Sequence, residues 1–145
     1  MSEPKPQRLE WGSKLQIQSI GLRYEILRRP LGLFFTPQEL AEEHDQWHIG
    51  VTDGDRVLAV LLLKILDGKT AKMRQVAVAE SLQGKGIGTE MVRFSESLCR
   101  QNQINHIELH ARKTAVPFYL SLGYQTEGEI FEEVGIPHVK MSNKL

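Results

Sequence analysis

The sequence predicts a mixed α/β fold of the α+β type, in which about four helices flank one mostly antiparallel sheet. Three short apolar segments between His48 and Val78 are separated by Asp-Gly turn signals, which is typical of an antiparallel meander. After Gly88 the apolar residues change to helical spacing, and helical and extended segments then alternate. The 145 residues contain no internal repeat or linker, so we expect a single domain over residues 1–145.

The first third of the chain is expected to hold a tail and two helices. Residues 1–13 are expected to form a loose N-terminal tail. Residues 20–29 carry apolar side chains at helical spacing, and Pro30 is expected to end this helix because a proline disfavours helical backbone in the residue before it. The segment Thr36-Pro-Gln-Glu resembles a capped helix start and predicts a second helix from Pro37 to about Glu43.

The remaining strands and helices are predicted from the spacing of apolar residues and from the turn residues between them. The expected strands cover residues 48–52, 57–66, 71–78, 106–110, 125–134 and 137–141, and the expected helices cover residues 88–102 and 114–122. The second of these strands contains the longest apolar run, Val57–Leu63, and is expected to be buried on both faces. This run is far shorter than the roughly 20 residues that cross a bilayer.

The charge balance and cysteine content exclude several functional classes. The chain has 18 basic and 18 acidic residues, so no global field attracts a nucleic-acid backbone. The single cysteine, Cys99, cannot form an internal disulfide, and no Cys/His cluster has zinc-ligand spacing. His44 and His48 are four residues apart with acidic residues nearby, and they are interpreted as polar surface, with a metal-binding pair as the alternative. With no signal-peptide pattern at the N-terminus, we expect a cytoplasmic protein without a metal, nucleic-acid or membrane partner. A homodimer is left open.

A glycine-rich turn carries the most informative pattern. Gly84, Gly86 and Gly88 lie between an expected strand and an amphipathic helix. Glycines let the backbone adopt positive φ and let a ligand approach closely, and the unpaired N–H groups of the first helical turn favour an anion. This arrangement indicates a pyrophosphate site, and a glycine-rich turn without a ligand is the alternative. The Walker A pattern is absent, and the even glycine spacing differs from the Rossmann fingerprint.

Two motifs in this order resemble signatures of the GNAT superfamily of N-acetyltransferases. Gln83-Gly-Lys-Gly-Ile-Gly88 resembles its acyl-CoA pyrophosphate loop, Arg/Gln-x-x-Gly-x-Gly/Ala, and the preceding Arg74–Val78 is similar to the family's strand. A helix and a strand later, Ala115-Val-Pro-Phe-Tyr-Leu-Ser-Leu-Gly-Tyr124 resembles the second signature, Ala-x-x-Phe/Leu-Tyr-x-x-x-Gly-Phe/Tyr. The resemblance covers Tyr24 to the C-terminus, and residues 131–141 resemble the ending of a small branch of uncharacterised bacterial acetyltransferases.

The resemblance implies a GNAT-like domain whose two central strands splay apart and hold acetyl-CoA between them. It implies that the pantetheine arm pairs with the backbone of Val76, Ala77 and Val78. It also implies that the pyrophosphate binds Gln83, Gly84, Lys85, Gly86, Ile87, Gly88 and Thr89. Many relatives have an asparagine seven residues before the signature tyrosine, where this chain has Arg112. Arg112 is therefore a further candidate for contact with acetyl-CoA.

The resemblance also implies catalytic roles. Tyr119 stands where family members use a tyrosine to protonate the leaving thiolate, although its spacing alone also fits a core aromatic. A base is expected because an amine with a pKa of about 10 is mostly protonated, and freeing it costs roughly 4 kcal/mol. Glu108 matches a glutamate base of relatives that acetylate protein N-termini, and it shares a strand face with His110. A solvated Glu108 is the alternative, and His138 in the closing hairpin is a second candidate base.

These observations predict an acetyl-CoA-dependent N-acyltransferase. The expected reaction is direct attack of a primary amine, of a small molecule, on acetyl-CoA in a ternary complex, with a backbone N–H of residues 76–78 stabilising the oxyanion. Two alternatives stay open. One is acetylation of protein lysines or N-termini, and the other is a non-catalytic acyl-CoA-binding regulatory module of the same fold. The expected partners are acetyl-CoA and an amine acceptor.

Overall fold

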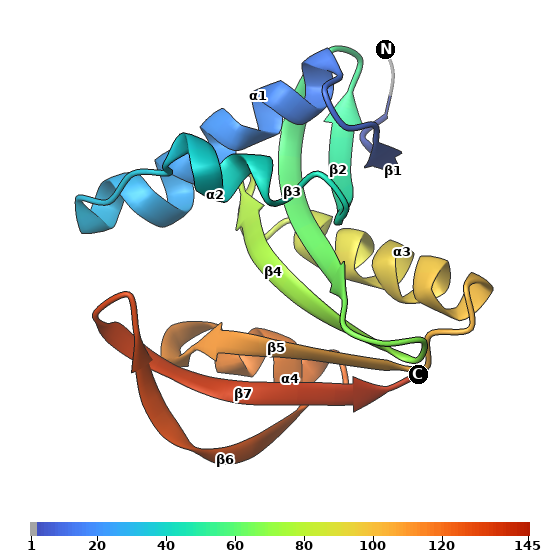
Figure 1. Ribbon diagram of the computed structural model, residues 1–145, viewed down its shortest axis with the longest axis vertical. Helices are drawn as coiled ribbons and strands as arrows, with labels where there is room; N and C mark the ends of the chain where they lie inside the picture. Colours follow the sequence, from blue (N-terminus) through green and yellow to red (C-terminus); the bar gives the residue numbers. More distant parts are fainter. Residues whose placement is uncertain (1–2) are drawn as a thin grey trace. The chain divides into compact units, whose positions relative to one another are not determined.

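The computed structural model describes residues 3–145 and contains one seven-stranded sheet in the order β1-β2-β3-β4-β5-β7-β6 (Figure 1). The strands are β1 (Lys5–Leu9), β2 (Trp47–Asp53), β3 (Arg56–Ile65), β4 (Thr70–Val78), β5 (His106–Arg112), β6 (Gln125–Glu133) and β7 (Ile136–Lys144). The pairs β1–β2, β2–β3, β5–β7 and β6–β7 are antiparallel, and β4–β5 is parallel. The mostly antiparallel sheet predicted from the sequence is therefore confirmed.

Residues 3–145 also contain four α-helices, in the predicted order. They are α1 (Lys14–Arg23), α2 (Pro37–Ala41), α3 (Ile87–Gln101) and α4 (Val116–Ser121). Shorter helical turns are η1 (Tyr24–Arg28), η2 (Arg29–Leu31), η3 (Glu80–Leu82) and η4 (Lys113–Ala115). A reciprocal capping box between Thr36 and Glu39 confirms the predicted start of α2. None of these helices has the length and apolar composition of a membrane span.

The expectation of a loose tail over residues 1–13 is wrong for the part that the structure describes. Lys5–Leu9 forms β1 and pairs with β2. The Gln7 Nε2 donates to Thr52 Oγ1 over 2.6 Å. Leu9 is buried against Gly50, where an added Cβ would lie only 2.8 Å from the Leu9 Cδ1. A short polar strand that follows Pro4 and contains Pro6 has too little apolar period to be recognised, and residues 1–2 lie outside the described part.

The first helix begins earlier than the predicted residue 20. Ser13 caps α1, and its Oγ accepts from the Gln16 N–H over 3.2 Å. The chain stays helical through η1, and Pro30 lies in the 3₁₀ turn η2 that follows. Gly32, with φ of 68°, ends this segment in the left-handed conformation. The predicted helix is thus the second part of a longer helical segment, which ends near the expected proline.

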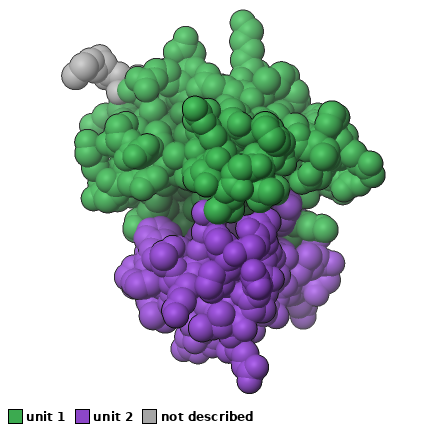
Figure 2. Space-filling model, turned by 90° about the vertical axis from the view of Figure 1, so that its left-hand side faces the viewer, with its two compact units in different colours: residues 1–64, 75–95 green, residues 65–74, 96–145 purple. Residues whose placement is uncertain are grey.

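The contact pattern divides the chain into two compact units (Figure 2). Unit 1 comprises the residues up to Lys64 together with Gln75–Ser95, and unit 2 comprises Ile65–Arg74 and Glu96–Leu145. Each unit is assembled from two separate segments, and the three internal boundaries fall within β3, β4 and α3. The single-domain organisation expected from the sequence stays a prediction.

The core of unit 1 is built around β3. All residues from Val57 to Leu63 are buried, which confirms the predicted burial of this strand on both faces. On one face, Val60 and Leu62 form a cluster with Ala77, against which the helical residues Leu22, Ile26 and Leu27 pack.

In unit 2, β5 and β7 present one apolar and one polar face. The alternate residues Ile107, Leu109, Ala111, Val139 and Met141 are buried. The polar residues between them therefore point to the opposite face, which confirms that Glu108 and His110 share a side of β5. A buried hydrogen bond from Tyr124 Oη to Glu96 Oε2, 2.9 Å long, joins α3 to the residue before β6. Strand β6 is exposed along most of its length.

Candidate functional site

The glycine-rich turn lies between η3 and α3 in unit 1. Gly84 and Gly86 have φ of 79° and 86°, which side-chain-bearing residues rarely adopt. A Cβ built on either glycine would meet no atom within 4 Å, so the space beside the turn is open. The helical hydrogen bonds of α3 begin with Glu90 N–H donating to Gly86 O over 3.0 Å. The preceding amides of the first turn have no acceptor within the helix and are suited to an anion.

The turn is tied to the end of β4. The side chain of Gln83 donates from Nε2 to the carbonyl oxygen of Val78 over 3.0 Å. The structure thereby brings the predicted cofactor residues of unit 1 together, with Val76–Val78 at the end of β4, Gln83–Gly86 in the exposed turn and Ile87–Thr89 in the first turn of α3. Arg112, the remaining predicted contact, is the last residue of β5 in unit 2.

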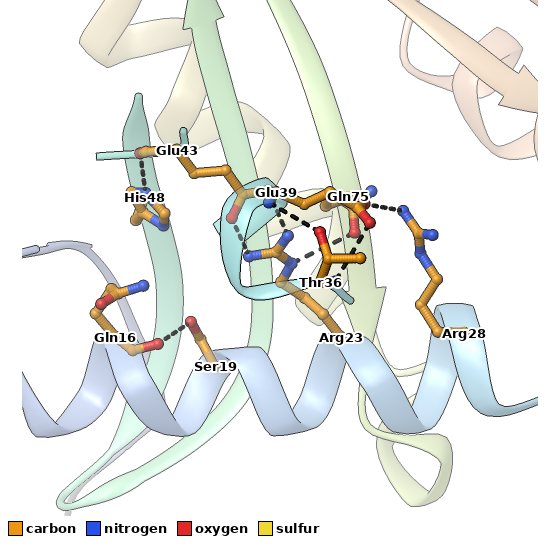
Figure 3. A network of polar contacts seen from close by, with 9 residues as sticks. All are labelled: Gln16, Ser19, Arg23, Arg28, Thr36, Glu39, Glu43, His48 and Gln75. Atoms are coloured by element: carbon orange, nitrogen blue, oxygen red, sulfur yellow. Dashed lines mark hydrogen bonds and ion pairs between the residues drawn. The ribbon is translucent and has the colours of Figure 1, made fainter. Parts of the chain in front are cut away.

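Strand β4 is distorted at Gln75, directly before Val76. Its φ of 56° is a left-handed conformation that costs a non-glycine residue about 1–3 kcal/mol. The Gln75 Oε1 accepts from Arg23 Nε over 3.4 Å, and the Arg23 Nη1 and Nη2 donate to Glu43 over 2.9 and 2.6 Å (Figure 3). The Arg23 side chain is fully buried. A buried ion pair thus links α1 and the turn after α2 to the distorted residue of β4.

An aromatic ring completes this network. The guanidinium carbons of Arg23 and Arg28 lie 4.8 and 4.5 Å from the ring centre of Phe35, within the range of cation–π attraction. The Glu43 carbonyl oxygen also accepts from the buried ring of His48, at 2.9 Å from its Nε2. Nothing in the sequence analysis indicated this network, because its members come from four separate segments and carry no motif.

The parallel ladder between β4 and β5 is short. It runs from Thr70 opposite His106 to Met73 opposite Leu109 and ends there. Beyond that point β5 continues with β7 as its partner, up to Arg112 opposite His138.

Unit 2 carries two of the predicted catalytic residues on what we call its polar face. This face consists of Glu108, His110, Phe131, Glu133, His138 and Lys140. The Glu108 Oε2 lies 3.2 Å from the Lys140 ammonium, which also lies 3.7 Å from Glu127 Oε2. The hydrogen bond and charge of Glu108, together with the charge of Glu127, raise the pKa of Lys140 above its usual value. Glu108 is therefore held in an ion pair.

Glu133 lies between the two histidines of the polar face. Its Oε1 is 2.9 Å from His110 Nδ1, and its Oε2 is 3.7 Å from His138 Nε2. Burial alone would raise the pKa of Glu133, but the hydrogen bond from His110 and the charges of His110, His138 and Lys72 together lower it. The carboxylate is therefore ionised at neutral pH. The His138 Nδ1 lies 2.9 Å from the carbonyl oxygen of Ile136.

Tyr119 lies in α4 and is only 6% exposed. Its ring centre lies 5.0 Å from that of Phe118 and 5.9 Å from that of Tyr124, both in edge-to-face arrangements. Burial raises the pKa of the Tyr119 hydroxyl far above its ordinary value of 10. The phenol therefore keeps its proton at neutral pH, and this environment suits a core aromatic as well as a proton donor.

Between residues 3 and 145, no group of three or more His, Cys, Asp or Glu side chains is placed to hold a metal ion. His44 is exposed, with Nδ1 3.1 Å from the carbonyl oxygen of Ala41, whereas His48 is buried. No sequence motif indicates the contact between His110 and Glu133, because it depends on the register of β6 against β7.

The sequence was found to match a known protein family and several known proteins. Residues 33–145 match the family model described as an acetyltransferase (GNAT) domain. The chain is 28% identical over 132 residues to the uncharacterized protein YyaT of Bacillus subtilis (strain 168), covering 84% of this chain and 88% of that protein.

Solved structures show the same fold. Escherichia coli ElaA superimposes with a TM-score of 0.84 at 22% identity, covering 98% of this chain and 100% of ElaA. A GNAT family acetyltransferase from Elizabethkingia anophelis with acetyl-CoA bound superimposes with a TM-score of 0.76 at 13% identity, over 100% of both chains.

Proposed function

This chain belongs to the GNAT acetyltransferase family, and we propose that it transfers an acetyl group from acetyl-CoA to a primary amine of a small molecule. The amine attacks the thioester directly in a ternary complex. The observation that carries the proposal is the exposed turn at the start of α3, where Gly84 and Gly86 hold positive φ beside open space. Such a turn presents backbone N–H groups to a pyrophosphate at close range.

The proposed contacts with acetyl-CoA follow the family's two motifs. The amides from Gln83 to Gly88 and the hydroxyl of Thr89 bind the pyrophosphate, and the exposed Lys85 adds positive charge. The backbone of Val76–Val78 pairs with the pantetheine arm, and one of its N–H groups stabilises the oxyanion. The side chain of Arg112 provides a further contact. Gln75 supports this role of β4, because its unusual backbone conformation turns the chain directly before Val76.

Tyr119 is proposed as the acid that protonates the leaving thiolate. Its burial keeps the phenol protonated, so that an O–H donor is present throughout the neutral range. Glu108 and His138 are the base candidates that the sequence predicts, and both make contacts on the polar face.

The acceptor panel is the experiment that separates the reaction classes. Release of free thiol from acetyl-CoA is measured with polyamines, amino acids, aminosugars and peptides that carry lysine or a free N-terminus. Turnover with a small amine and not with peptides supports the proposal. Turnover with peptides alone would favour a protein acceptor, and tight acetyl-CoA binding without turnover would favour a regulatory module.

Cofactor binding is tested by Gly86→Asp. The aspartate adds a side chain and a negative charge where the pyrophosphate is expected, so acetyl-CoA affinity measured by calorimetry should fall by at least about 100-fold. Gly12→Asp is the matched control, because Gly12 has a similar φ of 81° and equally open space around a Cβ. The control should retain affinity. A folded Gly86→Asp variant with unchanged affinity would remove the turn from the proposed site.

A further inference from the structure

We propose that His110 is the general base of the reaction and that Glu133 orients it. The inference rests on the proposed function. The carboxylate of Glu133 only accepts hydrogen bonds, so the contact of 2.9 Å requires the hydrogen to be on His110 Nδ1. In the neutral imidazole, Nε2 then keeps its lone pair and accepts a proton. A carboxylate that fixes the tautomer and ring orientation of a histidine is a recurring arrangement for a catalytic base.

The contacts of the other two candidates make them less suited to this role. The carboxylate of Glu108 is held by the Lys140 ammonium at 3.2 Å. His138 has only 5% of its side chain exposed, and both of its ring nitrogens face protein groups, Ile136 on one side and Glu133 on the other. The His110 side chain is 30% exposed. It therefore combines an oriented ring with access for an amine.

The position of His110 along β5 also fits a base. Leu109 is the last residue of β5 that pairs with β4, and His110 follows directly. His110 is therefore the first polar side chain of β5 beyond the parallel ladder. The ring of Phe131, 4.9 Å away in an edge-to-face arrangement, restricts the imidazole on one side and adds an apolar surface for the acceptor.

The proposed step balances in atoms and charge. The acceptor ammonium gives one proton to His110 Nε2 and becomes the free amine, and that proton passes from His110 to solvent. The amine nitrogen then forms the C–N bond to the acetyl carbon. As the C–S bond breaks, the nitrogen gives its second proton to His110, and the thiolate takes the phenolic proton of Tyr119. Solvent carries the second proton from His110 back to Tyr119, so each turnover releases one proton to the medium.

Several charged groups surround the imidazole and belong to its electrostatic environment. They are Glu133 on β6, His138 and Lys140 on β7, Glu108 and Arg112 on β5, and Lys72 on β4. Glu133 is the one at hydrogen-bond distance, and it stabilises the imidazolium formed when the base takes up a proton.

The test compares His110→Gln with His106→Gln, which removes the same residue type from the same strand and face. Once an acceptor is known, kcat should fall about 10²–10³-fold in His110→Gln and stay unchanged in His106→Gln. The acid limb of the pH dependence of kcat/KM should disappear. In His110→Ala, added imidazole should restore part of kcat, which a purely structural role of His110 would not allow.

A second variant keeps the base and removes its orientation. Glu133→Leu should lower kcat about tenfold, because the imidazole loses the acceptor that fixes its tautomer. If the wild-type protein is active and folded His110→Gln has the same kcat and the same acid limb, the inference is overturned and the proposed function stands. If wild-type protein binds acetyl-CoA but acetylates no amine, both are overturned.

Discussion

Replacing Glu43 with glutamine should destabilise the fold strongly, because it leaves the buried Arg23 without a counter-charge. The Arg23 side chain is 0% exposed and that of Glu43 6%, so water cannot compensate for the lost charge. Removing one partner of a buried ion pair costs about 3–5 kcal/mol. The Phe35 ring beneath the guanidinium offsets part of this loss, and we expect a cost near the lower figure, about 3 kcal/mol.

This cost is large for a chain of 145 residues. A typical domain unfolds with about 5–15 kcal/mol, so the substitution would remove a fifth or more of the stability. The corresponding fall in Tm is roughly 6–12 °C, at about 2–4 °C per kcal/mol. Urea unfolding followed by circular dichroism should show a lower midpoint with an unchanged m value.

Two control variants locate the effect in the buried pair. Glu25→Gln breaks the exposed Glu25–Arg29 pair, which is 3.0 Å long with both side chains more than half exposed, and should cost at most about 0.5 kcal/mol. The double variant Arg23→Met/Glu43→Leu should regain much of the lost stability, because no unpaired charge remains. The reasoning is refuted if Glu43→Gln costs no more than Glu25→Gln.

Two further predictions concern Tyr119 and His48. Tyr119→Phe keeps the ring but removes its donor, so kcat should fall about 100-fold while acetyl-CoA affinity and Tm barely change; an unaltered kcat would leave Tyr119 a core aromatic only. Burial lowers the pKa of His48, so the unfolded chain takes up this proton first as the pH falls. The stability contribution is complete above about pH 6.5 and declines below it. The urea midpoint should therefore change less between pH 7.5 and 5.5 in His48→Gln than in the wild type, and equal changes would contradict the argument.

The sequence was sufficient for most elements because their signals are local. The apolar run Val57–Leu63 and the amphipathic pattern of α3 each identify an element without knowledge of its partners. The start of α1 also carries a local signal, since Ser13 precedes Gln16 by three residues as in a capping box. Strand β1 carried no such signal and is defined by its pairing with β2.

The candidate site likewise contains residues that the sequence identifies and contacts that it does not. The residues of the glycine-rich turn are consecutive, and the family motif could identify them together. The contacts of His110 with Glu133 and of Arg23 with Glu43 join residues 23 and 20 positions apart. The first depends on the register of β6 against β7, which shifts between Glu127 and Phe131. Such a shift is set by tertiary packing and is not encoded in a short pattern.

The irregular outer strand β6 has a consequence for how copies of this chain meet. An exposed edge strand offers unpaired backbone groups to any other extended chain, and natural proteins discourage such addition with charges and bulges. In β6, Glu129 and Glu132 are exposed, and the irregularity around Gly128, with φ of 74°, interrupts a straight edge. Two copies meeting along β6 would bring their carboxylates together. The charge of this edge therefore repels the same edge of a second copy and opposes fibrillar association.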